Sequence, residues 1–390
     1  MQFEALQARY GDCLVLTLPG TDRPIRLLVD GGPAGVFRTS LKPRLDREAA
    51  QFKNEKPLAI DAVMVSHIDE DHILGVLDLF GVLLDADQKH APRPYHPTWL
   101  LHNSFDALVG EGEGGTARAL GGETVLASID AALDAAATAR SETARLVLQS
   151  YGQGSKLASL SAALKIGRNP PDQSVLGFHA NKPRVLKLGE ATLTVVGPLQ
   201  EDIDNFQQGW RDWKSKQKDT ASLAAYLDES VPNLSSIVVL LESGGNRVLL
   251  TGDARGDHIM QGLEGAGFMA TRGTIDIDIC KVPHHGSARD LDVDFFQRIR
   301  AKHYVASGDG TYGNPDRETL EMIEKARPEG GFTFHMTYSA EECDAGHKAW
   351  RANRKGPPFD QDRDGITQII TNWKHGGKIA VEEGPIQISL

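Results

Sequence analysis

The sequence contains little cysteine and no obvious cysteine motif. Its 390 residues include only three cysteines, Cys13, Cys280 and Cys343. An odd number at wide spacing, without a Cys-x-x-Cys pair, argues against a disulfide scaffold and against a cysteine-based zinc site. We therefore expect free thiols, buried where they fall in apolar strand-like stretches.

Basic charge and long apolar runs are also lacking. The net charge of −11 argues against a surface coated in lysine and arginine for non-specific nucleic-acid binding, although a local basic groove is compatible with it. No apolar run approaches the length of a membrane span, and no signal peptide is visible at the start of the chain. The sequence thus predicts a cytoplasmic protein with no membrane partner.

Against this background, one short stretch is dense in metal-binding side chains. Residues 66–72 read Ser-His-Ile-Asp-Glu-Asp-His, between an apolar run at 60–65 and a run with helical spacing at 73–80. Two imidazoles and two carboxylates this close together are typical of a site for one or two divalent cations. The alternative is a polar loop in which an aspartate caps the helix and the histidines are solvated. The candidate ligands are His67, Asp69, Asp71 and His72.

Further candidate ligands follow other predicted strands. Asp253 ends the sequence Leu-Leu-Thr-Gly-Asp, and His284 and His285 end a strand at 275–282. Polar groups at strand ends collect at one edge of a layered α/β protein, which predicts that these residues share a cleft with the 66–72 loop.

Three other polar residues at strand ends have two interpretations. Asp12 and Asp30 stand beside glycine, so they are either turn residues or groups that orient metal ligands. His102 ends an apolar run at 97–101 and is either a site residue or an ordinary buried or surface histidine.

The order of the predicted elements indicates an α/β protein of two packed sheets flanked by helices. Strands within residues 1–29 have no helix between them and should form an antiparallel meander. We expect a single domain over 1–390, with a helical insertion at about 104–181 and an extra C-terminal segment at about 335–390. Short strands are predicted in that segment at 367–372 and 378–381.

These motifs resemble the metallo-β-lactamase superfamily, an αββα sandwich whose metal loop reads His-x-His-x-Asp-His. Here Asp69 takes the place of the second histidine, giving His-x-Asp-x-Asp-His. That variant, with Asp-Gly-Gly at 30–32 and Lys-Val-Pro-His-His-Gly-Ser at 281–287, is similar to the hydrolase domain of the ComEC-like branch. It also resembles the phosphorylcholine esterases. The resemblance covers residues 1 to about 334, apart from the insertion.

The resemblance implies a dinuclear centre that holds two Zn²⁺ or Mn²⁺ ions. It implies Asp253 as the bridging ligand and one of His284 and His285 as a ligand, with the other near the substrate. Asp71 and His284 are the implied catalytic groups. Two departures affect this centre, since Gly197 and Asn314 stand where related domains often have histidine. The full implied ligand set is His67, Asp69, Asp71, His72, Asp253, His284 and His285.

The predicted function is a metal-dependent phosphodiesterase or nuclease acting on DNA or another nucleotide substrate. Lys281, Arg255 and Arg289 lie near the motifs and are either contacts to such a substrate or ordinary surface charges. One alternative is hydrolysis of a small phosphoester, which the acidic net charge favours over long DNA. Another is a catalytically degenerate domain that binds a metal or a partner. The sequence leaves the native metal, the substrate and the oligomeric state open.

Overall fold

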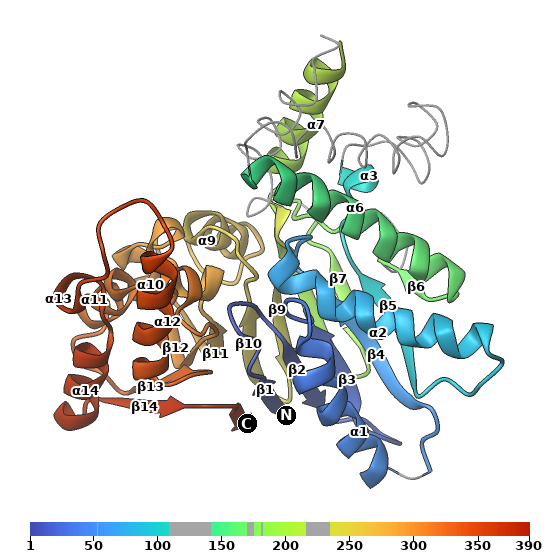
Figure 1. The fold of residues 1–390 in the computed structure, drawn as a ribbon, viewed down its shortest axis with the longest axis horizontal. Helices are drawn as coiled ribbons and strands as arrows, with labels where there is room; N and C mark the ends of the chain where they lie inside the picture. Colours follow the sequence, from blue (N-terminus) through green and yellow to red (C-terminus); the bar gives the residue numbers. More distant parts are fainter. Residues whose placement is uncertain (53, 109–141, 170–174, 181, 216–234) are drawn as a thin grey trace.

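Two mixed β-sheets packed face to face form the centre of the computed structural model (Figure 1). The structure describes the chain except residues 53, 109–141, 170–174, 181 and 216–234. Helices cover the outer face of each sheet, so the expected αββα arrangement of an α/β protein is confirmed.

The first sheet has the order β15-β1-β2-β3-β4-β5-β6. The pairs β1–β2 and β2–β3 are antiparallel, as expected for a meander without intervening helices, whereas β3 to β6 run parallel. Its strands are β1 (Gln2–Ala5), β2 (Leu14–Leu18), β3 (Ile25–Val29), β4 (Leu58–Met64), β5 (Tyr95–Leu101), β6 (Gly167–Arg168) and β15 (Ile386–Ser389).

The second sheet has the order β14-β13-β12-β11-β10-β9-β8-β7. Strands β7 to β10 pair antiparallel, and β10 to β14 pair parallel. Its strands are β7 (Val185–Leu188), β8 (Ala191–Gly197), β9 (Val238–Ser243), β10 (Asn246–Leu250), β11 (Ile275–Lys281), β12 (Ile299–Ala306), β13 (Phe332–Met336) and β14 (Ile379–Glu383).

The helices form the two outer layers. Those over the first sheet and its upper edge are α1 (Lys42–Gln51), α2 (Glu70–Gln88), α3 (Phe105–Leu108), α6 (Glu142–Ala163) and α7 (Gln200–Ser215). Those over the second sheet are α9 (Gly256–Gly265), α10 (Val293–Arg298), α11 (Arg317–Ala326), α12 (Ala340–Ala352), α13 (Gln361–Asp364) and α14 (Thr367–Gly376). Shorter turns are η1 (Phe37–Leu41), η3 (Pro283–Gly286), η4 (Ala288–Asp290) and η5 (Thr311–Gly313). None of the helices in the described part of the chain is long and apolar enough to cross a bilayer.

Alternation along the strands builds the inner core. Leu14, Leu16 and Leu18 of β2 face the second sheet, while Val15 between them packs in the outer core beneath the helices. Each such buried aliphatic side chain contributes about 1.5–3 kcal/mol. The three cysteines are free and buried, as expected.

The C-terminal segment completes both sheets. Strand β14 pairs with β13, and β15 pairs with β1 beside the N-terminus (Figure 1). The strand predicted at 367–372 is wrong, because these residues lie in α14. Its isoleucines suggested a strand, but Ile366, Ile369, Ile370 and Trp373 recur at helical spacing and are all buried.

Part of the expected insertion also joins the sheet. Helix α6 packs along α2 on the outer face of the first sheet, and β6 adds a short parallel strand beyond β5. The insertion is therefore tied to the element that carries the candidate metal loop. Residues 109–141, 170–174 and 181 of the insertion lie outside the described residues.

Candidate metal centre

The loop from β4 to α2 presents the first group of candidate ligands. It leaves the sheet at Met64, and α2 begins at Glu70, so Asp71 and His72 lie in the first helical turn. Asp69 occupies the N-cap position, yet its side chain makes no capping hydrogen bond. Asp69 therefore does not cap the helix, and its carboxylate instead lies near His67.

The second group comes from the ends of β10 and β11. Asp253 follows β10 and is buried, and His284 and His285 form the turn η3 after β11. Both histidines adopt left-handed backbone angles, with φ of 48° and 55°. Such angles are uncommon outside glycine and cost about 1–3 kcal/mol each. The fold holds this strain at the point where both imidazoles approach Asp253.

The carboxylate of Asp253 lies at the centre of the cluster. Its Oδ1 is 3.3 Å from Nε2 of His72, and its Oδ2 is 3.6 Å from Nε2 of His284. The same Oδ2 is 3.7 Å from Nε2 of both His67 and His285. Four imidazoles from two sheets thus surround one buried carboxylate.

The remaining aspartates close the cluster on the solvent side. Oδ2 of Asp71 is 3.3 Å from Nε2 of His285, and its Oδ1 is 3.8 Å from Nε2 of His72. Oδ2 of Asp69 is 3.6 Å from Nε2 of His67. The structure therefore brings together all seven residues that the resemblance implied.

The other ring nitrogen of each histidine is already held by the protein. Nδ1 of His72 is 2.9 Å from Asp30, and Nδ1 of His284 is 2.7 Å from Asp290. Nδ1 of His67 is 3.1 Å from Oγ of Ser66, and Nδ1 of His285 is 3.2 Å from Oγ of Ser307. Partners on Nδ1 orient an imidazole so that Nε2 is available to a metal.

The atoms that point into the cluster lack protein partners. Among the described residues, Nε2 of His67, His72 and His285 and Oδ1 of Asp253 are buried without a hydrogen bond. A buried polar atom left in this state costs about 1–3 kcal/mol. Histidine nitrogens and carboxylate oxygens are ligands of Zn²⁺ and Mn²⁺, so these orphaned atoms fit divalent cations.

Asp12 is more central than the sequence suggested. It lies with His72, Asp253 and His285 in one buried group of potential ligands. Its Oδ2 is 2.8 Å from Nζ of Lys281, and its Oδ1 accepts a hydrogen bond from Ser307 and lies 3.3 Å from Nδ1 of His285. With both oxygens engaged, Asp12 orients His285.

Lys281 is a buried structural partner. Its side chain is only 1% exposed, so it cannot contact a substrate at the surface. Of the other two basic candidates, Arg255 is exposed and paired with Asp257, and Arg289 is an exposed residue of η4, which follows the histidine turn in the chain.

Opposite charges in the cluster shift one another's pKa values. Burial by itself would raise the pKa of Asp253, but the neighbouring imidazoles, His72 first, hold it well below its usual value. Burial likewise would lower the pKa of His285, but Asp253 and Asp12 raise it to about 9. The cluster is thus an arrangement of mutually compensating groups that a cation can enter by displacing protons.

His102, Gly197 and Asn314, which the sequence singled out, supply no ligand to the cluster. His102 is buried at the end of β5 against Gly154 of α6, and burial lowers its pKa to about 4. A side chain at Gly197 would meet Val238, with its Cβ 2.9 Å from a Val238 methyl. The amide of Asn314 donates to the carbonyl of His284 at 3.5 Å.

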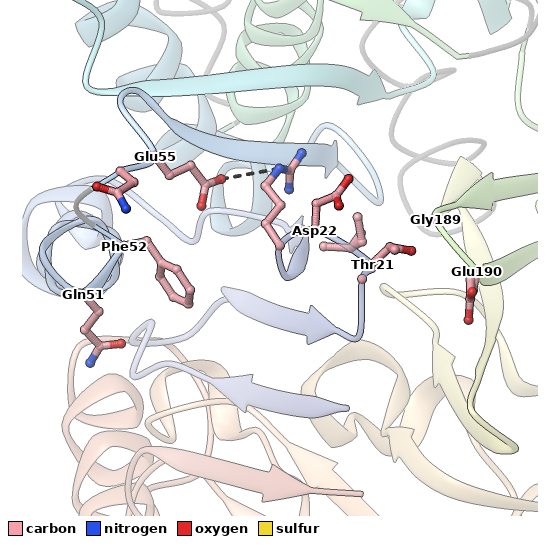
Figure 2. Close-up of a pocket in the computed structure, with 11 residues that line it drawn as sticks. Thr21, Asp22, Gln51, Phe52, Glu55, Gly189 and Glu190 are labelled. Atoms are coloured by element: carbon pink, nitrogen blue, oxygen red, sulfur yellow. Dashed lines mark ion pairs between the residues drawn. The ribbon is translucent and has the colours of Figure 1, made fainter.

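A separate pocket lies away from these groups. It has a volume of about 930 Å³ and is formed by the β2–β3 turn, the end of α1 and the β7–β8 turn (Figure 2). Its arginine, Arg23, is already paired with Asp61 and Glu55, and Asp22 and Glu190 add negative charge. None of the described residues that line this pocket belongs to the candidate metal ligands, and its one described arginine is already paired.

Comparisons with known proteins give short or weak matches. No protein-family profile matches the chain. Microtubule-associated protein 1A of Homo sapiens is 36% identical over 62 residues, which is 16% of this chain and 2% of that protein. ComE operon protein 3 of Bacillus subtilis is 28% identical over 100 residues, which is 25% of this chain and 12% of that protein. The matched segments therefore span only a small part of these relatives.

A solved structure aligns along the full length with low similarity. Zn²⁺-bound PqqB from Methylobacterium extorquens has a TM-score of 0.37 and 10% identity, with 100% of both chains covered.

Proposed function

We propose that this protein, which has the αββα fold of the metallo-β-lactamase superfamily and is distantly related to ComE operon protein 3, is a metal-dependent phosphodiesterase. The observation that carries the proposal is the convergence of four imidazole Nε2 atoms on Asp253, each held by a partner at Nδ1. Such an arrangement supports cation binding, and the partly exposed carboxylates of Asp69 and Asp71 would leave the centre open to a substrate.

We assign the ligands to two sites that share Asp253. Asp71, His72 and His285 would hold one ion. His67 and Asp69 would hold the other, which has fewer protein ligands because Gly197 supplies none. The oxygen-rich set accommodates Mn²⁺ as well as Zn²⁺. Divalent ions bound there would supply Lewis acidity, lowering the pKa of a water and offsetting charge on the phosphoryl group.

His284 is the best placed group for proton transfer to the leaving oxygen. Its side chain is 25% exposed, whereas that of His285 is 2% exposed. Asp290 lies 2.7 Å from its Nδ1, which fixes the ring and stabilises a protonated imidazole. We therefore propose His285 as the metal ligand and His284 as the proton donor.

Nucleic acid is the proposed substrate class, and small phosphoesters are the alternative. The test is hydrolysis of bis-p-nitrophenyl phosphate, linear DNA and phosphorylcholine after reconstitution with Mn²⁺ or Zn²⁺. We expect phosphodiester cleavage that Asp71→Ala and Asp253→Ala abolish. Cleavage that needs no metal, or that survives both substitutions, would reject the hydrolase. Cleavage of phosphorylcholine alone would select the small-substrate alternative.

Metal content separates the roles of the two adjacent histidines. His284→Gln should keep the wild-type number of ions per chain and lose at least about 100-fold in rate, the scale of general acid catalysis. His285→Gln should lose an ion. Loss of an ion in His284→Gln would instead make His284 a ligand.

A further inference from the structure

An exposed aromatic residue lies beside the candidate metal centre. Tyr312, in η5, is 48% exposed and is one of two large apolar side chains exposed in the described part of the chain. Its backbone is held at φ 72°, an angle uncommon for a bulky residue. Its phenol lies close enough to Asp71 and Glu70 that their charges help raise its pKa, after burial.

Tyr312 belongs to a row of three rings from distant parts of the chain. Its ring lies 5.2 Å from that of Tyr10 and 6.0 Å from that of Trp350, between centroids. Tyr10 directly precedes the loop that packs on Asp71, since a Cβ at Gly11 would lie 2.0 Å from the Asp71 carbonyl oxygen. The row therefore starts at the metal loop and extends to the end of α12.

Arginines lie over the two ends of the row. The guanidinium carbon of Arg9 is 5.0 Å from the centroid of Tyr10. Those of Arg351 and Arg354 are 5.4 and 4.9 Å from the centroid of Trp350. In the described residues none of these three guanidinium groups forms an ion pair with a carboxylate, whereas Arg23, Arg26, Arg44, Arg93, Arg247 and Arg298 do. In a chain of net charge −11, the three arginines of this strip therefore carry positive charge that no ion pair with a described carboxylate neutralises.

We propose that this aromatic–arginine strip, Tyr10, Tyr312, Trp350, Arg9, Arg351 and Arg354, binds single-stranded nucleic acid and leads it to the metal centre. The proposal names the substrate class of the proposed phosphodiesterase and rests on that function. Unpaired bases stack on aromatic and guanidinium faces, and guanidinium groups without a carboxylate partner bind phosphates. Bases inside a duplex cannot reach the rings.

The arginines also argue against a small cationic ligand. Aromatic rings alone can bind a quaternary ammonium such as choline through their faces. Here guanidinium groups already lie over Tyr10 and Trp350, and they would repel a second cation. The same charges attract a polyanion.

Fluorescence anisotropy with a labelled 12-residue oligothymidylate tests the strip directly. The full-length protein is used in EDTA, so that binding is measured without cleavage. We expect Tyr312→Ala and Trp350→Ala each to raise Kd at least about fivefold, the lower end for one base stack. Tyr312→Phe, which keeps the ring, should bind within twofold of wild type. Thermal unfolding verifies that each variant is folded.

Salt dependence tests the arginines. Replacing Arg351 and Arg354 together by glutamine should reduce the slope of log Kd against log salt by about 1.4, the value for two phosphate contacts on a single strand. The matched control is Lys89→Gln, an exposed cation paired with Asp85 at the far end of α2, which should change neither Kd nor slope.

The outcomes separate this inference from the proposed function. Ring variants that bind within twofold of wild type overturn the strip, as does a wild type that binds no oligonucleotide yet hydrolyses bis-p-nitrophenyl phosphate with metal. Ring-dependent binding of choline in place of the oligonucleotide also overturns it. Ring-dependent oligonucleotide binding without metal-dependent hydrolysis supports the strip and rejects the hydrolase.

Discussion

Asp30→Asn should weaken metal binding without removing a metal ligand. In the wild type, Oδ1 of Asp30 accepts a hydrogen bond from the Ser66 amide at 2.8 Å, and Oδ2 accepts one from the Ser66 hydroxyl at 2.7 Å. The same Oδ2 is 2.9 Å from Nδ1 of His72. This arrangement places a proton on Nδ1, so that Nε2, which lies 3.3 Å from Oδ1 of Asp253, would be the nitrogen available to a cation.

Asparagine keeps the shape of the Asp30 side chain but replaces one acceptor oxygen by an NH₂ group, which is a donor. Its oxygen can still accept from the Ser66 amide, but its NH₂ group then faces Nδ1 of His72. Two donors cannot pair, so the imidazole must shift its proton to Nε2, which removes the metal-binding lone pair. The left-handed backbone of Asp30, with φ of 56°, tolerates asparagine, so the substitution should not disturb the turn.

We expect a 10- to 100-fold loss of affinity, or about 1.4–2.7 kcal/mol, the scale for losing a group that orients a ligand. Chelator competition on the metal-free protein measures it for Zn²⁺ and Mn²⁺ separately. The control is Asp61→Asn, another carboxylate that accepts a backbone hydrogen bond, from Arg26, but lies outside the cluster. A folded Asp30→Asn protein within threefold of wild-type affinity for both ions would refute the tautomer argument.

Two further predictions concern the packing that supports the centre. Lys281→Met leaves Asp12 buried without its cationic partner and should lower the free energy of unfolding, measured in urea, by about 3–5 kcal/mol. Adding Asp12→Asn should restore more than half of that loss, and a double variant as unstable as the single one would contradict a charge effect. Gly75→Ala places a Cβ 2.0 Å from the Gly31 carbonyl oxygen and should cost about 1–3 kcal/mol. Gly81→Ala, on the same helix with open space around it, should instead raise the free energy of unfolding by at most about 1 kcal/mol. Equal effects at both positions would reject the steric explanation.

Local patterns explain why much of the site was predictable. His67 to His72 could be read as a strand-end loop because an apolar run precedes it and a helical pattern follows. The same reasoning located Asp253 and the histidine pair after strands. The α/β sandwich followed from the order of those strands and from the resemblance carried by the motifs.

Long-range contacts explain what remained hidden. The sequence could not decide whether Asp12 is a turn residue or a group that orients a metal ligand, because its partners, Lys281 and Ser307, lie in the other half of the chain. The aromatic row could not be read at all, since Tyr10, Tyr312 and Trp350 share no local spacing. The strand predicted at 367–372 was wrong for a local reason. The β-branched composition of this stretch suggested a strand, whereas the spacing of its apolar side chains is that of the helix α14.

The division of the metal ligands between the two sheets links cation binding to folding. Residues 67–72 follow β4 of the first sheet, and Asp253 and His285 follow β10 and β11 of the second, so the complete centre forms only when both sheets have packed. A cation bound there would hold the two halves together and would bind the unfolded chain far less well. At 100 times its dissociation constant it would add about 2.7 kcal/mol to the free energy of unfolding. The resistance of this protein to heat would then vary with the free metal concentration around it, in the absence of any substrate.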